Sequence, residues 1–154
     1  MSSNKNVVVR EFSWPVRVYY EDTDSGGVVY YANYLKFMER ARTEFLRSIG
    51  YEQDQLQQEL GIIFAVHSAN IQYKKPARFN DELNVVTSIT SLGRASIHFK
   101  QSVFLESSHH ASSTTGLLSE AEIKIACLNV NKFTPQSIPA EIIDKIRKEI
   151  HCGS

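Results

Sequence analysis

The stretch Tyr20-Glu21-Asp22-Thr23-Asp24-Ser25-Gly26-Gly27-Val28-Val29-Tyr30-Tyr31-Ala32-Asn33-Tyr34 joins a strand-like segment to the longest helical pattern in this chain. Residues 14–20, before it, are rich in β-branched and aromatic side chains, which favour a first strand. After it, apolar residues recur with helical spacing from about residue 33 to residue 49, and Gly50 is placed to end that helix. Because the helix has a broad apolar face, it must pack against a large surface such as a sheet.

The order of the remaining segments favours an α+β fold. We expect a short helix over 53–60, four strands over 62–74, 82–91, 95–106 and 117–129, and a closing helix over 138–151. Residues 107–116 are rich in Ser, Thr and His, which is typical of an exposed hairpin loop. Short connections between consecutive strands predict antiparallel pairing, with the long helix packed on a curved sheet. In the strand over 95–106, alternation predicts one buried face, made by Ile97, Phe99, Gln101, Val103 and Leu105.

Length and charge limit the function classes. The 154 residues suit one domain over 1–154, with its core over about 14–131. Lys plus Arg and Asp plus Glu both number 17, so no net charge attracts nucleic acid or an anionic membrane. No apolar run is long enough for a signal peptide or a bilayer span. Cys127 and Cys152 lack metal-ligand spacing, so we expect no metal and a reduced, cytoplasmic setting.

The join between strand and helix has the residue types that acyl chemistry needs. Glu21, Asp22 and Asp24 lie between apolar segments, so at least one carboxylate is expected to be partly desolvated. Gly26 and Gly27 permit close backbone approach, and the first N–H groups of the helix have no partner within it. These groups can stabilise an oxygen that becomes negative. Asp and Gly are also ordinary turn and cap residues, so the local pattern alone leaves a capped turn as the other interpretation.

A longer run identifies a family. Residues 16–34, continued by Phe37-Met38-Glu39-Arg40-Ala41-Arg42, resemble the hotdog-fold thioesterases, and within them the Tol-Pal-associated acyl-CoA thioesterases of the YbgC type, related to 4-hydroxybenzoyl-CoA thioesterase. Residues 73–81 and 117–123 agree with the family's later segments. The resemblance covers about residues 16–130. It implies a curved antiparallel sheet of about five strands wrapped around a long central helix.

The resemblance also implies an activity and a site. Asp24 corresponds to the family's catalytic carboxylate, and the backbone N–H of Tyr31 corresponds to the group that polarises the thioester carbonyl. Asp24 would activate water as a general base or attack as a nucleophile; water attack needs no strained covalent step, and we favour it. Some members carry His where this chain has Tyr31, and a phenol with a pKa of about 10 cannot replace imidazole as a base near neutral pH. The oxyanion role, which needs only the backbone N–H, survives this difference.

The implied substrate is an acyl-CoA, so coenzyme A belongs to the substrate and no cofactor is expected. We expect Gly26, Gly27 and Val28 to contact it, and Lys74, Lys75 and Arg78 either to bind the CoA phosphates or to form a solvated strand end. Glu21 and Asp22 either tune Asp24 through like-charge repulsion or face solvent, and we favour exposure to solvent. The resemblance implies a homodimer or a dimer of dimers, with the sites at the dimer interface.

Two other functions are compatible with the same pocket. One is a non-catalytic module that binds acyl-CoA or acyl carrier protein in association with the cell-envelope Tol-Pal system. The other is hydratase or dehydratase chemistry, against which the absence of His near the motif argues.

Overall fold

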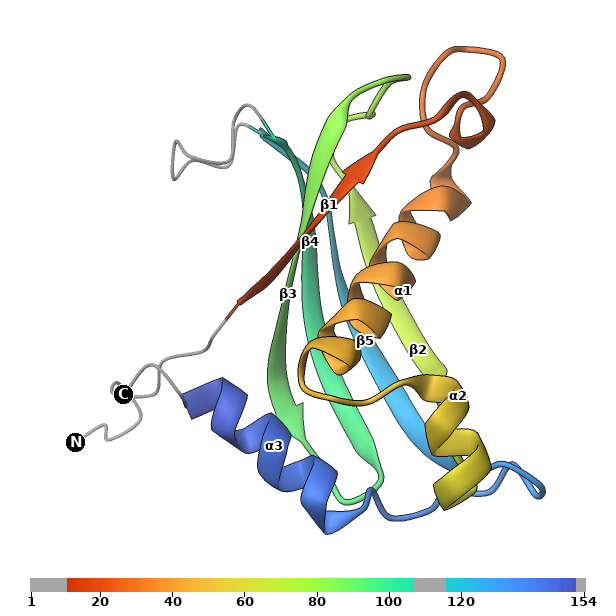
Figure 1. Cartoon of the computed structure of the whole chain (residues 1–154). Coiled ribbons are helices and arrows are strands. Elements are labelled where there is room, and N and C mark those ends of the chain that lie inside the picture. Colours follow the sequence, from red (N-terminus) through yellow and green to blue (C-terminus); the bar gives the residue numbers. More distant parts are fainter. Residues whose placement is uncertain (1–10, 107–115, 152–154) are drawn as a thin grey trace.

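Five strands form one antiparallel sheet that curves around a central helix. The computed structural model describes residues 11–106 and 116–151. The strands are β1 (Phe12–Arg17), β2 (Ile62–Tyr73), β3 (Glu82–Leu92), β4 (Ser96–Leu105) and β5 (Leu117–Asn129), in the sheet order β1-β3-β4-β5-β2. Helix α1 (Tyr31–Ser48) lies against the concave side of the sheet (Figure 1). The expected α+β class is confirmed.

Helix α1 buries the apolar face that its sequence predicted. Its buried residues are Tyr34, Phe37, Met38, Ala41, Arg42, Phe45 and Leu46, whose spacings of three and four place them on one side of the helix. Phe45 packs edge-on against Phe99 of β4, with the ring centroids 6.3 Å apart. The helix begins two residues earlier than expected, at Tyr31, and Gly50 follows its end with a φ of +101°.

The inner face of the sheet contains buried polar side chains among apolar ones, and Gln101 and Thr87 are two of them. Along β4, Ile97, Phe99, Gln101 and Val103 are buried, as the alternation predicted. The Gln101 Nε2 donates to the Met38 carbonyl oxygen and to Thr87 Oγ1, both at 2.9 Å, and its Oε1 accepts from Arg42 Nη1 at 2.9 Å. A buried amide is tolerated only when it is hydrogen-bonded, so this network fixes α1 on β3 and β4.

Several boundaries differ from the expected ones. The first strand ends at Arg17 because the Tyr19 N–H donates to the Asp22 carboxylate at 2.8 Å and a 3₁₀ turn, η2 (Tyr20–Asp22), redirects the chain. The expected helix over 53–60 is a short α2 (Gln53–Gln55) followed by a π-helical turn, η3 (Leu56–Leu60). Helix α3 (Ala140–His151) starts after Pro139 rather than at residue 138. The hairpin loop expected over 107–116 lies outside the described residues except for residue 116.

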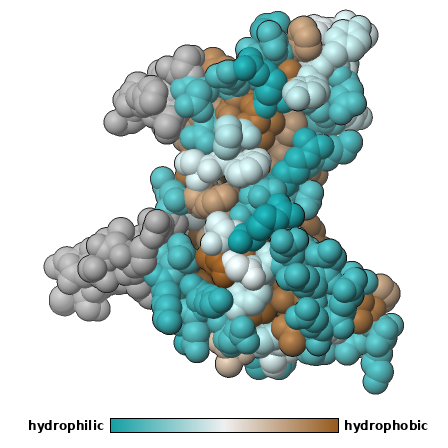
Figure 2. Space-filling view, viewed as in Figure 1, coloured by the Kyte–Doolittle hydropathy of each residue, from teal (hydrophilic) through white to brown (hydrophobic). Residues whose placement is uncertain are grey.

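The exterior is mostly polar. On the face seen in Figure 2, apolar groups form separate patches among hydrophilic side chains. None of the helices in the described ranges is both long and apolar enough to cross a bilayer.

Candidate active site

Asp22 fixes the entry to α1. It is 7% exposed, and one carboxylate oxygen accepts from the Tyr19 N–H while the other accepts from Asn33 Nδ2, each at 2.8 Å. Its carbonyl oxygen accepts from the Tyr30 N–H at 3.1 Å. The expectation that both Glu21 and Asp22 face solvent is therefore wrong for Asp22: the carboxylate buried in this loop is Asp22, whereas Glu21 is exposed. Both oxygens of Asp22 are used in holding the loop together.

Asp24 lies in the tight turn that follows. Its N–H donates to the Val28 carbonyl at 2.9 Å, and its own carbonyl accepts from the Gly27 N–H at 3.0 Å. Its Oδ1 accepts from the Gly26 N–H at 2.8 Å, which orients the side chain. A Cβ on Gly26 would lie 3.3 Å from that oxygen, and Gly27 has a φ of +80°. The two glycines thus shape the turn that presents an exposed carboxylate.

This carboxylate lines a cavity of about 420 Å³. The other lining residues are Val28, Val29, Tyr30, Tyr31, Tyr34, Tyr73, Lys74, Lys75 and Pro76. They come from the loop before α1, the first turn of α1 and the end of β2, which the fold brings together from distant parts of the sequence. The cavity combines one acid, two lysines and an aromatic wall.

The first turn of α1, which begins at the cavity-lining Tyr31, leaves backbone donors open. The Asn33 N–H is satisfied by the Tyr30 carbonyl at 2.9 Å. Within the described residues, no acceptor meets the N–H of Tyr31 or of Ala32, and no side chain caps the helix at Tyr30. Free N–H groups at a helix N-terminus, reinforced by the helix dipole, favour a negatively charged oxygen.

The basic residues divide between the cavity and its surroundings. Lys74 and Lys75 line the cavity, and the Lys74 Nζ lies 3.7 Å from a carboxylate oxygen of Glu120. Arg78 does not line it; its backbone forms a bridge with Val28, and its N–H donates to the Asp81 carboxylate at 2.9 Å. Of the residues expected at the site, the cavity lining includes Asp24, Val28, Tyr31, Lys74 and Lys75, whereas Gly26 and Gly27 shape the adjacent turn and Arg78 lies beyond it.

Two further tyrosines, Tyr34 and Tyr73, line this cavity, and Tyr73 was not expected at the site. Burial raises the pKa of Tyr34, although the Ala77 N–H that its hydroxyl accepts at 2.9 Å lowers it. Burial also raises the pKa of Tyr73, with a smaller contribution from Tyr31. Both phenols are therefore neutral near pH 7, and neither serves as a base. The only sequence signal for Tyr73 was its position directly before Lys74 and Lys75.

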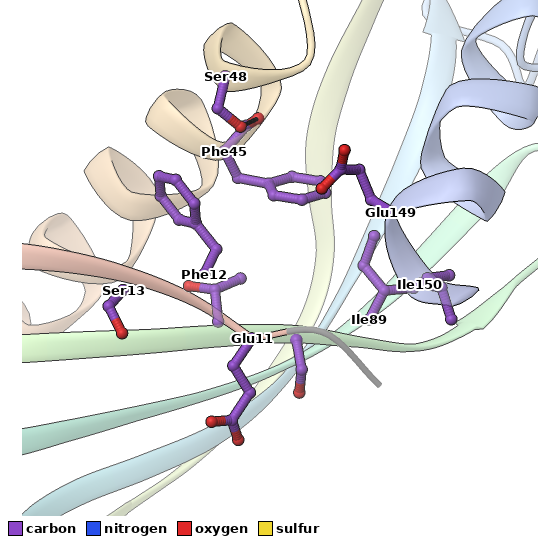
Figure 3. Close-up of a pocket in the computed structure, with 10 residues that line it drawn as sticks. Glu11, Phe12, Ser13, Phe45, Ser48, Ile89, Glu149 and Ile150 are labelled. Atoms are coloured by element: carbon purple, nitrogen blue, oxygen red, sulfur yellow. Dashed lines mark hydrogen bonds between the residues drawn. The ribbon is translucent and has the colours of Figure 1, made fainter. Parts of the chain in front are cut away.

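A second cavity, of about 330 Å³, lies at the other end of α1 (Figure 3). In Figure 3 the rings of Phe12 and Phe45 lie next to each other, and Glu149 of α3 lies beside Phe45. Ser48 is the last of the 18 residues of α1 and Tyr31 the first, so this cavity lies roughly 25 Å along the helix from the Asp24 cavity. It is thus separate from the acidic turn and the open N–H groups.

The chain is similar to known thioesterases in sequence and in fold. The thioesterase superfamily matches residues 26–111. The acyl-CoA thioester hydrolase YbgC of Escherichia coli is 42% identical over 137 residues, which cover 89% of this chain and 96% of that protein. The acyl-CoA thioesterase YbgC of Haemophilus influenzae is 43% identical over 131 residues, covering 85% and 90%.

Solved structures share the fold. The crystal structure of a probable thioesterase from Bartonella henselae has a TM-score of 0.75 at 31% identity and covers 84% of this chain and 99% of that one. The family match covers residues 26–111, and the relatives align over nearly their full length. The protein therefore belongs to the thioesterase superfamily, as a thioester hydrolase with the hotdog fold that the resemblance implied.

Proposed function

We propose that this enzyme hydrolyses acyl-CoA thioesters, with Asp24 as the reacting carboxylate and the N-terminus of α1 as the oxyanion site. The observation that supports this most directly is that Asp24 and Tyr31 line the same cavity, and that the Tyr31 N–H has no acceptor within the described residues. The relatives from Escherichia coli and Haemophilus influenzae are named as acyl-CoA thioester hydrolases, which supports the substrate class.

The oxyanion site would act on the carbonyl. As the thioester carbonyl carbon becomes tetrahedral, its oxygen gains negative charge, and the N–H groups of Tyr31 and Ala32 would donate to it. Removing one such donor typically costs about 3–4 kcal/mol of barrier. Because these donors belong to the backbone at the start of a long, packed helix, they are held in place before the reaction begins.

Asp24 would supply the water or the nucleophile. In the route we favour, its carboxylate takes a proton from water as the water oxygen attacks the carbonyl carbon; the C–S bond then breaks, and CoA leaves as a thiolate that acquires a proton. In the other route, a carboxylate oxygen attacks directly, CoA leaves, and water hydrolyses the mixed anhydride. Both give a carboxylic acid and CoA. The Gly26 N–H bond to Oδ1 leaves Oδ2 for this chemistry.

The lysines would receive the other end of the substrate. Lys74 and Lys75 line the cavity at the end of β2, and Arg78 follows a short way along the chain. Ammonium and guanidinium groups bind phosphate oxygens by charge-assisted hydrogen bonds. We therefore infer that the CoA phosphates lie over this basic segment while the acyl group enters the aromatic part of the cavity.

Self-association is part of the proposal. β2 is an edge strand of 12 residues whose residues 66–70 are all exposed. A long exposed edge offers unpaired N–H and C=O groups to a second strand. Two copies joined through β2 about a two-fold axis would extend the sheet and place their α1 helices side by side, near the active-site loops.

Arg42 provides a second argument for this contact. It is 8% exposed, and in the described part of the chain no carboxylate forms an ion pair with its guanidinium. Burial lowers its pKa, and the charge of Glu39 opposes that effect. Arg42 lines a small cavity of about 110 Å³ on the β2 side, with Glu39, Phe64 and Val66. A buried cation is costly without a counter-charge, and Glu39 of the partner subunit would supply it.

The decisive experiment compares wild type with Asp24→Asn. Free-thiol release is measured for short, medium, long and aromatic acyl-CoAs; Asn has the same size but cannot accept the proton. We expect turnover by the wild type and a loss of several orders of magnitude in Asp24→Asn. Equal activity of the two proteins would rule out a catalytic role of Asp24. Tight acyl-CoA binding without turnover by the wild type would instead favour the non-catalytic binding module.

A further inference from the structure

Tyr73 occupies a particular place in the cavity. It is the last residue of β2, and its ring contacts two tyrosines of α1. The centroid distance is 4.7 Å to Tyr31 and 5.5 Å to Tyr34, with interplanar angles of 40° and 62°. Tilted and edge-on pairs at these distances are favourable beyond their buried area. The three rings form one continuous wall of the cavity that Asp24 lines.

The Tyr73 hydroxyl closes that wall. It donates to the carbonyl oxygen of Tyr31 at 3.3 Å, across 42 positions of sequence. This hydrogen bond connects the end of β2 to the first turn of α1. The position of the Tyr73 ring is therefore fixed both by its contacts with the two other rings and by its hydroxyl. Tyr34 behind it is 2% exposed, and its hydroxyl is held by the Ala77 N–H. Tyr73, at 40% exposed, is the ring of this pair that an entering group would meet.

We propose that Tyr73 is the specificity-determining residue of this enzyme: its ring limits the size of the acyl group that can lie beside Asp24. The inference rests on the proposed thioesterase function and goes beyond it by assigning selectivity to one side chain. The substrates favoured by the wild type would be acyl groups small enough to lie against the tyrosine wall. A bulkier acyl group would need the space that the Tyr73 ring fills.

The test is the ratio of kcat/KM for decanoyl-CoA to that for butyryl-CoA. Each methylene that becomes buried strengthens binding by about fourfold. Replacing the ring with a methyl group in Tyr73→Ala opens the wall, and we expect this ratio to rise at least tenfold over the wild-type ratio. Tyr73→Phe retains the ring without the hydroxyl, and we expect it to change the ratio by less than threefold.

A matched control removes another exposed aromatic ring. Phe133 is 65% exposed in the loop after β5, and β5 pairs its end, Asn129, with Ile62 at the opposite end of β2 from Tyr73. Phe133→Ala should leave the ratio at the wild-type value. Circular dichroism and thermal melting confirm that the variants are folded. A folded Tyr73→Ala with an unchanged ratio, or an equal change in Phe133→Ala, would overturn the proposal.

The role of Tyr73 can also be tested if the protein has no thioesterase activity. If the wild type turns over none of the acyl-CoAs, the same compounds serve as stable ligands in calorimetry. The dependence of Kd on acyl length then replaces kcat/KM. Tyr73→Ala should tighten decanoyl-CoA binding relative to butyryl-CoA by at least tenfold; an unchanged relative affinity rejects the role of Tyr73 independently of catalysis.

Discussion

At the scale of residues, two adjacent glycines perform different tasks in the acidic turn. Gly26 leaves room for the Asp24 carboxylate, since an added Cβ would lie 3.3 Å from Oδ1. Gly27 meets nothing within 4 Å, but its φ of +80° disfavours any residue with a side chain. Gly26 therefore allows the Asp24 side chain its position, and Gly27 allows the backbone its left-handed conformation.

These two roles predict that Gly26→Ala lowers mainly the activity and that Gly27→Ala lowers mainly the stability. In Gly26→Ala the carboxylate must shift, and we expect kcat to fall roughly tenfold or more, because small misplacements of reacting groups are costly. Its stability should change little. In Gly27→Ala the left-handed backbone should cost about 1 kcal/mol of unfolding free energy. Urea denaturation and thiol-release assays on both variants distinguish the two; the same pattern in both variants would contradict this division of roles.

Residue types alone did not distinguish the acids of this turn. Asp22 and Asp24 are two positions apart, and either was compatible with burial. Asp22 became the buried one because η2 turns its side chain toward the Tyr19 N–H and Asn33, whereas Asp24 follows the turn and reaches the cavity. Such a distinction depends on hydrogen bonds to partners that periodicity does not identify.

At the scale of elements, α1 is held by polar contacts as well as by apolar packing. The side chain of Gln101 makes hydrogen bonds to Met38 and Arg42 of α1 and to Thr87 of β3. Because Gln101 is fully buried, these bonds form away from water, where an unpaired amide would be costly. We expect the position of the helix N-terminus, where we propose the oxyanion site, to depend on this attachment.

Replacing Gln101 tests the attachment. Gln101→Met retains the approximate size but leaves the Arg42 guanidinium and the Met38 carbonyl without that partner, and we expect a loss of about 3 kcal/mol of unfolding free energy. The neighbouring Ser102→Ala, on the opposite face of β4, should change stability by no more than about 0.5 kcal/mol. Chemical denaturation measures both. A Gln101→Met protein as stable as wild type would mean that the network does not stabilise α1.

At the scale of the whole molecule, the proposed dimer accounts for two features of the single chain. One is the exposed 12-residue edge of β2, and the other is the buried Arg42, whose guanidinium forms no ion pair within the described residues. Glu39 lies one helical turn before Arg42, exposed and accepting from Thr43 Oγ1 at 2.7 Å. In a symmetric contact, each subunit would provide one charge of each sign.

A charge exchange tests this contact. We expect Glu39→Lys to raise the dissociation constant of the dimer by about tenfold or more, since it places like charges across the interface. The double variant Glu39→Arg with Arg42→Glu should recover most of the association. Arg40→Glu, on an exposed neighbouring position, is the control for charge alone. Analytical ultracentrifugation reports each constant, and a monomeric wild type or an unaffected Glu39→Lys dimer would rule the pairing out.

The amino-acid sequence by itself determined the elements and the family. Strand and helix periodicities reflect burial on one face, which is a local pattern, so α1 and the five strands were predictable to within a few residues. The tertiary structure decided which side chains meet. Tyr73 reaches Tyr31 across 42 positions, and Arg42 reaches Gln101 across 59, because sheet curvature and strand order bring them together. Contacts of that range depend on the packing of whole elements, and no local pattern contains them.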